Sequence, residues 1–412
     1  MIIIHDVNNV ARLASKVLER ALRIMPVMVV TGARQTGKTT LARDLIGDEG
    51  RRFYTLDDLA VFDQAMTAPE DLVTRAPRMT LDEVQRVPGL MLAVKRHVDR
   101  ERVPGQFVLT GSANLLMLRS VADSLSGRAA YVTLWPLTRR EQLGFGTCGI
   151  WSDLFDADDA EWGAVVNGSD APPADWREVA RRGGFPTPAI ELDGHDEREL
   201  WFSGYLHTYL ERDLRDLSAV SSLPDFRRLM QATALRIGQL VNQTELGRDV
   251  ALPQPTVHRW LNLLEASYQL IKVPAYSVNR TKRLIKTPKV YWADTGLGLH
   301  LSGHAQPEGA HLENIVLGDL LSWKESQVSK PDIFYWRTTV GDEVDFVVDT
   351  GRALLPIEVK ATRRPTPADA KGLQTFRAEY GARSRAGLLL HDGEDTEWLA
   401  PGILATPWWR VV

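Results

Sequence analysis

The first part of the chain alternates between helix-length amphipathic segments and short runs of consecutive apolar residues. A helix is expected over residues 10–24, where apolar side chains recur at helical spacing. Three apolar runs have the length of a buried strand and lie at residues 27–31, 79–81 and 107–110. Because strands that alternate with helices favour βαβ units, we expect an α/β fold built around a parallel sheet.

The pattern changes after residue 150. Residues 151–176 are acidic and contain glycine and proline, which indicates a solvated insertion or linker. From residue 201 to 299 the pattern is mainly helical, and from residue 311 onward it returns to a helix followed by strands. These changes predict three domains, at residues 1–195, 196–304 and 305–412.

A phosphate-binding motif follows the first expected strand. Residues 32–39 match G-x-x-x-x-G-K-[ST] in full, and a helix-compatible run comes after them. Gly32 and Gly37 let the backbone curl so that successive N–H groups face phosphates. Lys38 is placed to reach the β- and γ-phosphates of ATP, and the Thr39 hydroxyl to ligate Mg²⁺. The expected nucleotide-binding residues are Gly32, Ala33, Arg34, Gln35, Thr36, Gly37, Lys38, Thr39 and Thr40.

A second acidic element lies at the end of the run at residues 79–81. Asp82 is expected to bind Mg²⁺ through water, and Glu83 to polarise the attacking water. At the end of the next expected strand, Thr110 and Ser112 are both candidates for sensing the γ-phosphate or the water. Arg128 follows a glycine turn and is a candidate arginine finger, with a structural ion pair as the alternative.

Composition and charge exclude several classes of protein. The 412 residues are 44% hydrophobic and 25% charged, as in ordinary globular proteins. The formal charge of −4 gives no protein-wide basic field, so any DNA-binding face would be a local patch. The single cysteine, Cys148, excludes an internal disulfide framework and a cysteine-rich zinc site. Without a signal peptide or an 18-residue apolar stretch, we expect a cytoplasmic protein with no membrane partner.

In combination, these motifs resemble those of the bacterial and archaeal AAA-type (AAA_14-like) P-loop ATPases that carry a C-terminal DUF4143 domain. The segments that carry the resemblance are residues 31–40, 81–85, 109–112, 126–128, 183–186, 209–213, 282–291, 294–297 and 341–346. The resemblance implies an AAA+-like domain over 1–195, a helical and winged-helix domain over 196–304, and a restriction-endonuclease-like module over 305–412. The acidic stretch is an insertion relative to the usual pattern.

A candidate DNA-reading segment lies in the expected middle domain. Asn242 and Glu245 resemble a capping box, and Pro255 suits the first turn of a second helix. Helix, tight turn and helix can present a recognition helix to DNA, and a basic hairpin wing could grip phosphates; the alternative is a lid or a protein–protein module. The candidate DNA contacts are Thr256, His258, Arg259, Asn262, Arg280, Lys282, Arg283, Lys286 and Lys289.

The C-terminal module carries a constellation of acids and a lysine. Glu358 and Lys360 lie two residues apart on an expected strand and so project from one face. Asp345 on the neighbouring strand and Glu313 on a helix can converge with them. Such a cluster around Mg²⁺ or Mn²⁺ hydrolyses phosphodiesters, and its order is similar to the PD-(D/E)xK nuclease pattern. A buried pair for domain docking, or a nuclease fold kept as a binding platform, is the alternative.

These expectations combine into one leading hypothesis. The chain is predicted to be a Mg²⁺-dependent ATPase that converts ATP to ADP and couples its nucleotide state to nucleic acid, DNA in particular. Lys38, Asp82, Glu83 and Arg128 are the expected catalytic residues. An arginine that acts in trans would require a homo-oligomer. An ATP-gated DNA nuclease and a non-nucleolytic nucleotide-dependent switch are the alternatives.

Overall fold

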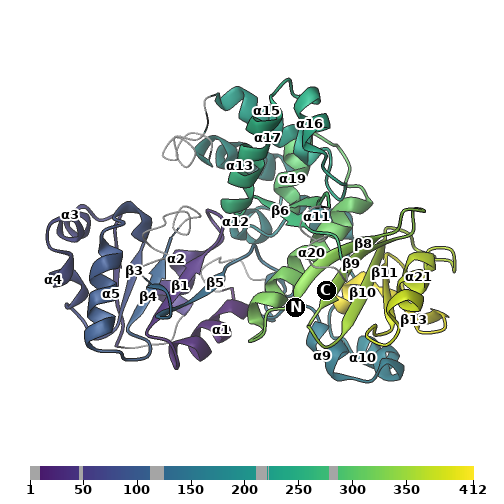
Figure 1. The fold of residues 1–412 in the computed structure, drawn as a ribbon, viewed down its shortest axis with the longest axis horizontal. Coiled ribbons are helices and arrows are strands. Elements are labelled where there is room, and N and C mark those ends of the chain that lie inside the picture. The colour runs from purple at the N-terminus through teal and green to yellow at the C-terminus, as the bar shows by residue number, and fades with distance from the viewer. Residues whose placement is uncertain (1–9, 46–49, 112–124, 210–219, 221, 278–285) are drawn as a thin grey trace.

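The computed structural model describes residues 10–45, 50–111, 125–209, 220, 222–277 and 286–412, which form three lobes (Figure 1). The first lobe holds a five-stranded sheet, the middle lobe is mainly helical, and the last holds a six-stranded sheet. Among the described residues, no helix is both long enough and apolar enough to cross a membrane.

The first lobe is an α/β layer structure around a parallel sheet of order β2-β3-β4-β1-β5. The strands are β1 (Val27–Thr31), β2 (Arg52–Thr55), β3 (Met79–Asp82), β4 (Phe107–Thr110) and β5 (Ala129–Thr133). The helices are α1 (Leu13–Leu22), α2 (Lys38–Thr40), α3 (Leu59–Thr67), α4 (Pro69–Val73) and α5 (Leu90–Arg100). Alternate residues of β1 enter two different hydrophobic cores, one on each side of the sheet. The predicted parallel sheet with strands buried on both faces is confirmed.

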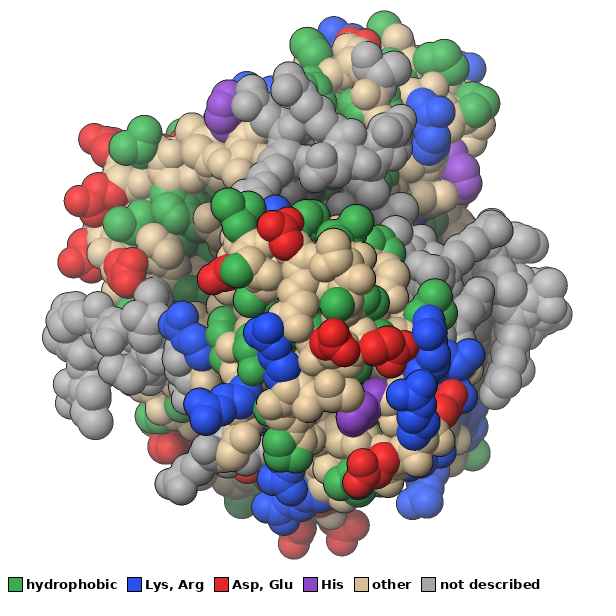
Figure 2. Space-filling view, turned by 90° about the vertical axis from the view of Figure 1, so that its left-hand side faces the viewer, with side chains coloured by type: hydrophobic (Ala, Val, Ile, Leu, Met, Phe, Trp, Pro, Cys, Tyr) green, Lys and Arg blue, Asp and Glu red, His purple; other side chains and the backbone are tan. Residues whose placement is uncertain are grey.

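The outer face of this lobe, over α3 to α5, mixes acidic, basic and apolar side chains (Figure 2). Arg96 pairs with Glu70 at 3.0 Å, while Leu59 and Met66 are exposed. Because charges of both signs are interspersed, this face carries no basic field for nucleic acid.

Residues 151–176 are not the solvated stretch that the sequence predicts. They form α9 (Trp151–Asp156), α10 (Trp162–Asn167) and the start of α11 (Trp176–Arg182). All three helix-starting tryptophans are fully buried in one core with strands of the last lobe. Figure 1 shows α9 and α10 against the last lobe. Most of the acids are exposed while the tryptophans face inward, so the acidic composition of the segment does not report its buried side.

The middle lobe packs its helices around an aromatic core that includes Phe185, Phe202 and Trp260. Its helices are α12 (Pro186–Ile190), α13 (His195–Thr208), α15 (Leu223–Ala234), α16 (Gln243–Asp249), α17 (Gln254–Ala266) and α19 (Thr295–Ser302). Its strands, β6 (Leu270–Val273) and β7 (Lys289–Trp292), form an antiparallel ribbon. Ala33 of the phosphate-binding loop belongs to the same core, which joins the middle lobe to the first.

The β6–β7 ribbon is shared by two hydrophobic cores. Leu270 and Trp292 face the middle-lobe core, whereas Ile271 and Tyr291 face the core of the last lobe. Successive strand residues point to opposite faces, so a two-stranded ribbon can serve both cores at once. The middle and last lobes therefore meet through this ribbon.

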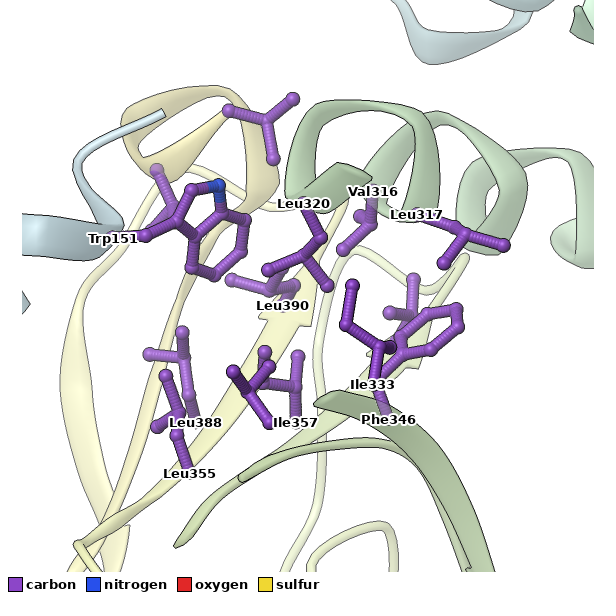
Figure 3. Close-up of a cluster of buried hydrophobic side chains, with 14 of the residues drawn as sticks. Trp151, Val316, Leu317, Leu320, Ile333, Phe346, Leu355, Ile357, Leu388 and Leu390 are labelled. Atoms are coloured by element: carbon purple, nitrogen blue, oxygen red, sulfur yellow. The ribbon is translucent and has the colours of Figure 1, made fainter. Parts of the chain in front are cut away.

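The last lobe is built on a mixed sheet of order β12-β13-β11-β10-β9-β8. The strands are β8 (Asp332–Arg337), β9 (Glu343–Asp349), β10 (Leu354–Lys360), β11 (Gly387–His391), β12 (Glu397–Ala400) and β13 (Ile403–Pro407). The helices are α20 (Gly309–Ser326), α21 (Lys371–Tyr380) and α22 (Trp408–Val411). One face packs against α20, and Figure 3 shows Leu317 and Leu320 of that helix above Ile357 and Leu388 of the sheet.

The end of α20 reaches the first lobe. Arg20 of α1 donates to the Ser326 carbonyl at 2.9 Å, and Thr133 N–H of β5 donates to Glu325 at 3.1 Å. Helix α20 therefore links the edge of the first sheet to the core of the last lobe.

Candidate nucleotide-binding site

The loop between β1 and α2 has the curled backbone of a phosphate cradle. Gly32, Gln35 and Gly37 all have positive φ values, at 138°, 61° and 89°. A Cβ at residue 32 would lie 2.3 Å from the Leu134 carbonyl oxygen, so no side chain fits there. Gln35 occupies its left-handed conformation at a steric cost that glycine would not carry. The motif thus forms the loop that the sequence predicts.

Lys38 is buried at the start of α2 and turns back toward the loop. Its ammonium donates to the Gly32 carbonyl at 3.2 Å and to the Ala33 carbonyl at 2.6 Å. The positive charge therefore lies inside the curl, where the phosphates of a nucleotide would be held. Binding of a triphosphate would require Lys38 to exchange these carbonyl partners for phosphate oxygens.

Asp82 collects hydroxyl groups at the carboxyl end of β3. Thr39 Oγ1 lies 3.1 and 3.2 Å from its two oxygens, Thr55 donates at 3.3 Å, and Thr110 donates a short hydrogen bond. Oxygen ligands from Thr39 and Asp82 are thus side by side at the loop, a donor set that suits the Mg²⁺ of MgATP. The structure brings together the predicted metal residues and one of the two predicted sensors.

Glu83 follows directly in a left-handed backbone conformation, with φ at 58°. Its N–H donates to Thr110 Oγ1 at 3.4 Å, and its carboxylate accepts a short hydrogen bond from the Gln85 amide. Thr110 therefore touches both members of the acidic pair. Ser112, the other predicted sensor, lies outside the described residues.

A pocket of about 280 Å³ opens beside the phosphate-binding loop. Gln35, Gly37 and Thr40 of the loop region form one side of it. The opposite side comes from segments far away in the sequence, and its residues are Val10, Arg12, Leu137, Pro186 and Thr187. The apolar members can contact a base or a ribose, and the loop members lie on the phosphate side.

Two positioning residues of this site carry no local sequence signal. Arg12 donates to the Thr36 carbonyl of the loop at 2.8 Å and to Glu141 at 3.1 Å, and its side chain is buried. Tyr268, from the turn before β6, donates to Thr31 Oγ1 at 2.9 Å. Burial raises the pKa of Tyr268, so its hydroxyl remains a donor at neutral pH. Both contacts depend on tertiary packing, which no residue spacing reports.

Arg128 is not part of its own nucleotide site, contrary to the sequence prediction. It immediately precedes β5, whose first residue pairs with Val27 at the start of β1, whereas the phosphate-binding loop follows the end of β1. The five-residue strand separates them by about 16 Å. Its guanidinium instead forms two hydrogen bonds with Asp99, at 2.5 and 3.0 Å, and this pairing raises the pKa of Arg128. In the chain itself, the structural ion pair is the observed role.

Helices α16 and α17 take the arrangement expected for residues 242–264. The Asn242 side chain accepts from Thr244 and Glu245 N–H groups, and Pro255 lies in the first turn of α17. Val257, Trp260, Leu261 and Leu264 are buried. His258, Arg259 and Asn262 are exposed, whereas Thr256 is half-buried. His258 contacts both Gln243 and Asn262.

The predicted basic wing divides into three groups. Lys286 is exposed, whereas Arg280, Lys282 and Arg283 lie outside the described residues. The prediction that Lys289 contacts DNA is wrong, because its side chain is buried against the last lobe. Its ammonium lies 3.0 Å from Asp345 and also pairs with Glu343. A lysine held by two carboxylates inside the protein is not available to phosphates.

The four residues of the predicted nuclease constellation do converge. Asp345 accepts from Val359 N–H at 3.0 Å, Glu358 pairs with Lys360 at 2.5 Å, and Glu313 accepts from Tyr291 OH at 2.8 Å. Burial, together with the nearby Asp345 carboxylate, raises the pKa of Glu313 to about 8 and that of Glu358 above its usual range. In the part of the chain that the structure describes, no three acidic, histidine or cysteine side chains are arranged to hold a metal ion.

Comparison with known proteins gives relatives over most of the chain. An uncharacterised protein of Mycobacterium tuberculosis is 29% identical over 400 residues, which are 95% of this chain and 82% of the relative. An uncharacterised protein of Haemophilus influenzae is 24% identical over 81% of this chain and 82% of its own length. Among solved structures, a Walker-type ATPase of Pyrococcus abyssi matches 73% of this chain and 96% of its own at 15% identity, with a TM-score of 0.42.

Family models match three consecutive parts of the chain. Residues 25–143 match the AAA domain, which spans the sheet and the loop described above. Residues 173–308 match a domain of unknown function, DUF8612, and residues 308–411 match another, DUF4143. The parallel sheet with its phosphate-binding loop agrees with the first of these matches. The chain thus carries a region that matches the AAA domain, followed by a C-terminal region that matches DUF4143.

Proposed function

We propose that the chain is a Mg²⁺-dependent ATP hydrolase of the AAA+ type. The observation that carries this proposal is the position of Asp82, whose carboxylate lies 3.1 Å from the Thr39 hydroxyl at the end of the phosphate-binding loop. An acid and a hydroxyl joined in this way can share one Mg²⁺ ion with the β- and γ-phosphates. The match of residues 25–143 to the AAA domain supports the same activity.

Each residue of the site has a role in this proposal. Lys38 binds the β- and γ-phosphates, and Thr39 and Asp82 hold the Mg²⁺ of MgATP, Asp82 through water. Glu83 polarises the attacking water. Thr110 senses the γ-phosphate and positions Asp82 and Glu83 through its hydrogen bonds to both residues. The pocket between the loop and Pro186 takes the nucleoside. Arg12 keeps the Thr36 carbonyl turned away from the phosphates.

The transition-state arginine then comes from a second copy of the chain. Arg128 is too far from its own phosphate-binding loop, so it can act only in trans, after release from Asp99. This proposal requires a homo-oligomer in the active state. Sedimentation of the protein with and without MgATP tests the requirement, and full activity of a strict monomer would contradict it.

The ATPase proposal is tested with two variants that separate binding from hydrolysis. Lys38→Ala is expected to reduce ATP binding by at least about 100-fold, because the buried phosphate cation is lost. Glu83→Gln is expected to bind ATP with unchanged affinity but to hydrolyse it about 10² to 10⁴ times more slowly. Fluorescent-nucleotide titration and phosphate release measure the two effects. Wild-type turnover in Glu83→Gln protein would exclude Glu83 as the residue that activates water.

We further propose that the nucleotide state regulates binding of DNA at the exposed face of α17. The residues that favour this are His258, Arg259 and Asn262, which are exposed on the second helix of a helix–turn–helix arrangement followed by a ribbon. Arg259→Ala is expected to weaken duplex binding by about tenfold and to flatten its dependence on salt. Glu265→Ala on the same helix removes an acid instead and is the matched control. Equal affinities of all three proteins for a random duplex would reject DNA binding at this face.

A further inference from the structure

The C-terminal cluster contains a lysine that the nuclease pattern does not include. Lys289 comes from β7, in the ribbon between the middle and last lobes, and its side chain is buried. Its ammonium lies 3.0 Å from Asp345 Oδ1, pairs with Glu343 and lies 6.0 Å from the centre of the Tyr335 ring. A fixed positive charge therefore lies directly against the acid that is expected to bind a metal.

Three further carboxylate oxygens of the cluster are also engaged. Asp345 Oδ2 accepts from Val359 N–H, Glu358 Oε1 pairs with Lys360, and Glu313 Oε2 accepts from Tyr291. Glu358 Oε2 is buried with no hydrogen-bond partner among the described residues. A divalent ion needs several carboxylate oxygens directed at one point, and here they are directed at protein donors. The residues present thus do not fit the metal that the nuclease pattern implies.

Charge balance explains why a lysine is found at this position. Asp345 and Glu358 are buried, Glu313 and Glu343 lie half-buried in the same cluster, and carboxylates this close together repel one another. Lys360 lies at the rim of the cluster and is one-third exposed, whereas Lys289 is buried in its interior. The only buried ammonium among the described residues of the cluster therefore comes from the ribbon and not from the sheet that carries the acids.

We propose that Lys289 is the resident cation of this cluster: it takes the place of a divalent metal ion and fastens the β6–β7 ribbon to the last lobe. In this arrangement the C-terminal module has no metal-dependent nuclease activity. The acids instead bind a segment of the same chain. The proposal does not depend on ATP hydrolysis, since neither Lys289 nor Asp345 contacts the nucleotide site.

The test uses the full chain, with Mn²⁺ alone as the probe of the site and no nucleotide present. Wild-type protein and the Asp345→Asn variant are expected to bind the same amount of Mn²⁺, as measured by electron paramagnetic resonance. Lys289→Met is expected to unfold several degrees lower than wild type, because buried acids lose their counter-charge. Addition of Mn²⁺ should restore part of that loss, because Asp345 Oδ1 is then no longer held by the lysine and can bind the ion together with Glu358 Oε2. Lys286→Met, on the exposed part of the same segment, is the matched control and should behave as wild type.

A double variant tests the proposal even if Lys289→Met alone does not fold. Lys289→Met with Asp345→Asn removes one charge of each sign, so it should unfold at a higher temperature than Lys289→Met and show a weaker response to Mn²⁺. Mn²⁺ binding to wild type that is lost in Asp345→Asn would overturn the proposal, as would DNA cleavage with Mn²⁺ and ATP that is lost in Asp345→Ala. A Lys289→Met variant as stable as wild type would overturn it as well.

Discussion

At the scale of single residues, the nucleotide site depends on one acid that gathers several hydroxyls. Asp82 accepts from Thr39, Thr55 and Thr110, which come from three different elements of the first lobe. A buried carboxylate is costly unless its oxygens are hydrogen-bonded, and hydroxyls satisfy them without a competing positive charge. The printed side-chain partners of Asp82 are thus hydroxyls, whereas Asp345 is paired with the ammonium of Lys289.

One buried acid away from both sites makes stability depend on pH. Burial raises the pKa of Asp319 to about 6, although Gly149 N–H and Trp151 Nε1 both donate to it. The folded protein then holds this proton more tightly than the unfolded chain does. Its contribution to stability is present below the unfolded pKa of about 4 and is lost as pH rises toward 6.

Asp319→Asn is therefore expected to stabilise the protein at pH 7 by up to about 3 kcal/mol and to have little effect near pH 4. The amide oxygen can still accept from Gly149 and Trp151, so the packing should be retained. Urea unfolding of both proteins at the two pH values measures the difference. Asp156→Asn, an exposed acid on α9, is the control; a pH-independent effect of Asp319→Asn would contradict the explanation.

The sequence predicts some of these residues and not others, for a physical reason. The phosphate-binding loop and the pair Asp82–Glu83 follow from short motifs, because their geometry depends on neighbours along the chain. The sequence predicts that Arg128 and Lys289 bind phosphates, yet they pair with Asp99 and Asp345. The ion-pair partner of a charged side chain depends on tertiary packing, and the spacing of residues along the sequence does not indicate which partner it will be.

At the scale of elements, residues 151–176 show how composition can mislead. The segment has the acids of a solvated linker, but its tryptophans are spaced so that each begins a helix and enters the core of the last lobe. Trp162 donates to the Leu154 carbonyl at 2.9 Å, and Arg385 lies over its ring. The pattern of βαβ units, by contrast, predicts β1, β3 and β4, because these strands are continuous apolar runs. It does not predict β2 and β5, which lie at the two edges of the sheet and are mostly half-buried.

Trp162→Ala should accordingly destabilise the whole protein by about 3–5 kcal/mol, through lost burial and the cavity that remains. Trp398→Ala is the matched control, since Trp398 is 43% exposed on β12 and should cost less than about 1 kcal/mol. Thermal and urea unfolding give both values. A neutral Trp162→Ala variant would instead support the predicted solvated insertion.

At the scale of the whole molecule, the nucleotide site is in direct contact with the middle lobe. Tyr268 donates to Thr31 at the end of β1, and Pro186 of α12 lines the pocket beside the loop. A nucleotide that fills this pocket contacts both lobes. Its binding energy can therefore favour one relative position of the lobes, which is the physical requirement for regulation at a distance.

We expect ATP to slow amide hydrogen exchange at residues 186–190 and 264–270 as well as in the phosphate-binding loop. In Tyr268→Phe protein the effect on 264–270 should shrink, because the hydrogen bond to Thr31 is lost, while protection of the loop itself remains. Exchange measured by mass spectrometry with and without ATP checks both statements. Protection confined to the loop in wild type would show that the middle lobe does not respond to the nucleotide.

The shared β6–β7 ribbon sets a limit on how this protein can be divided. A fragment that ends before residue 305 would leave Ile271, Val273 and Tyr291 without the core they pack into. Equally, the last lobe alone would expose its acids without Lys289. The middle lobe and the last lobe are therefore not interchangeable modules. Recombination that exchanges one lobe must also exchange the other, so we expect the two lobes to be inherited together.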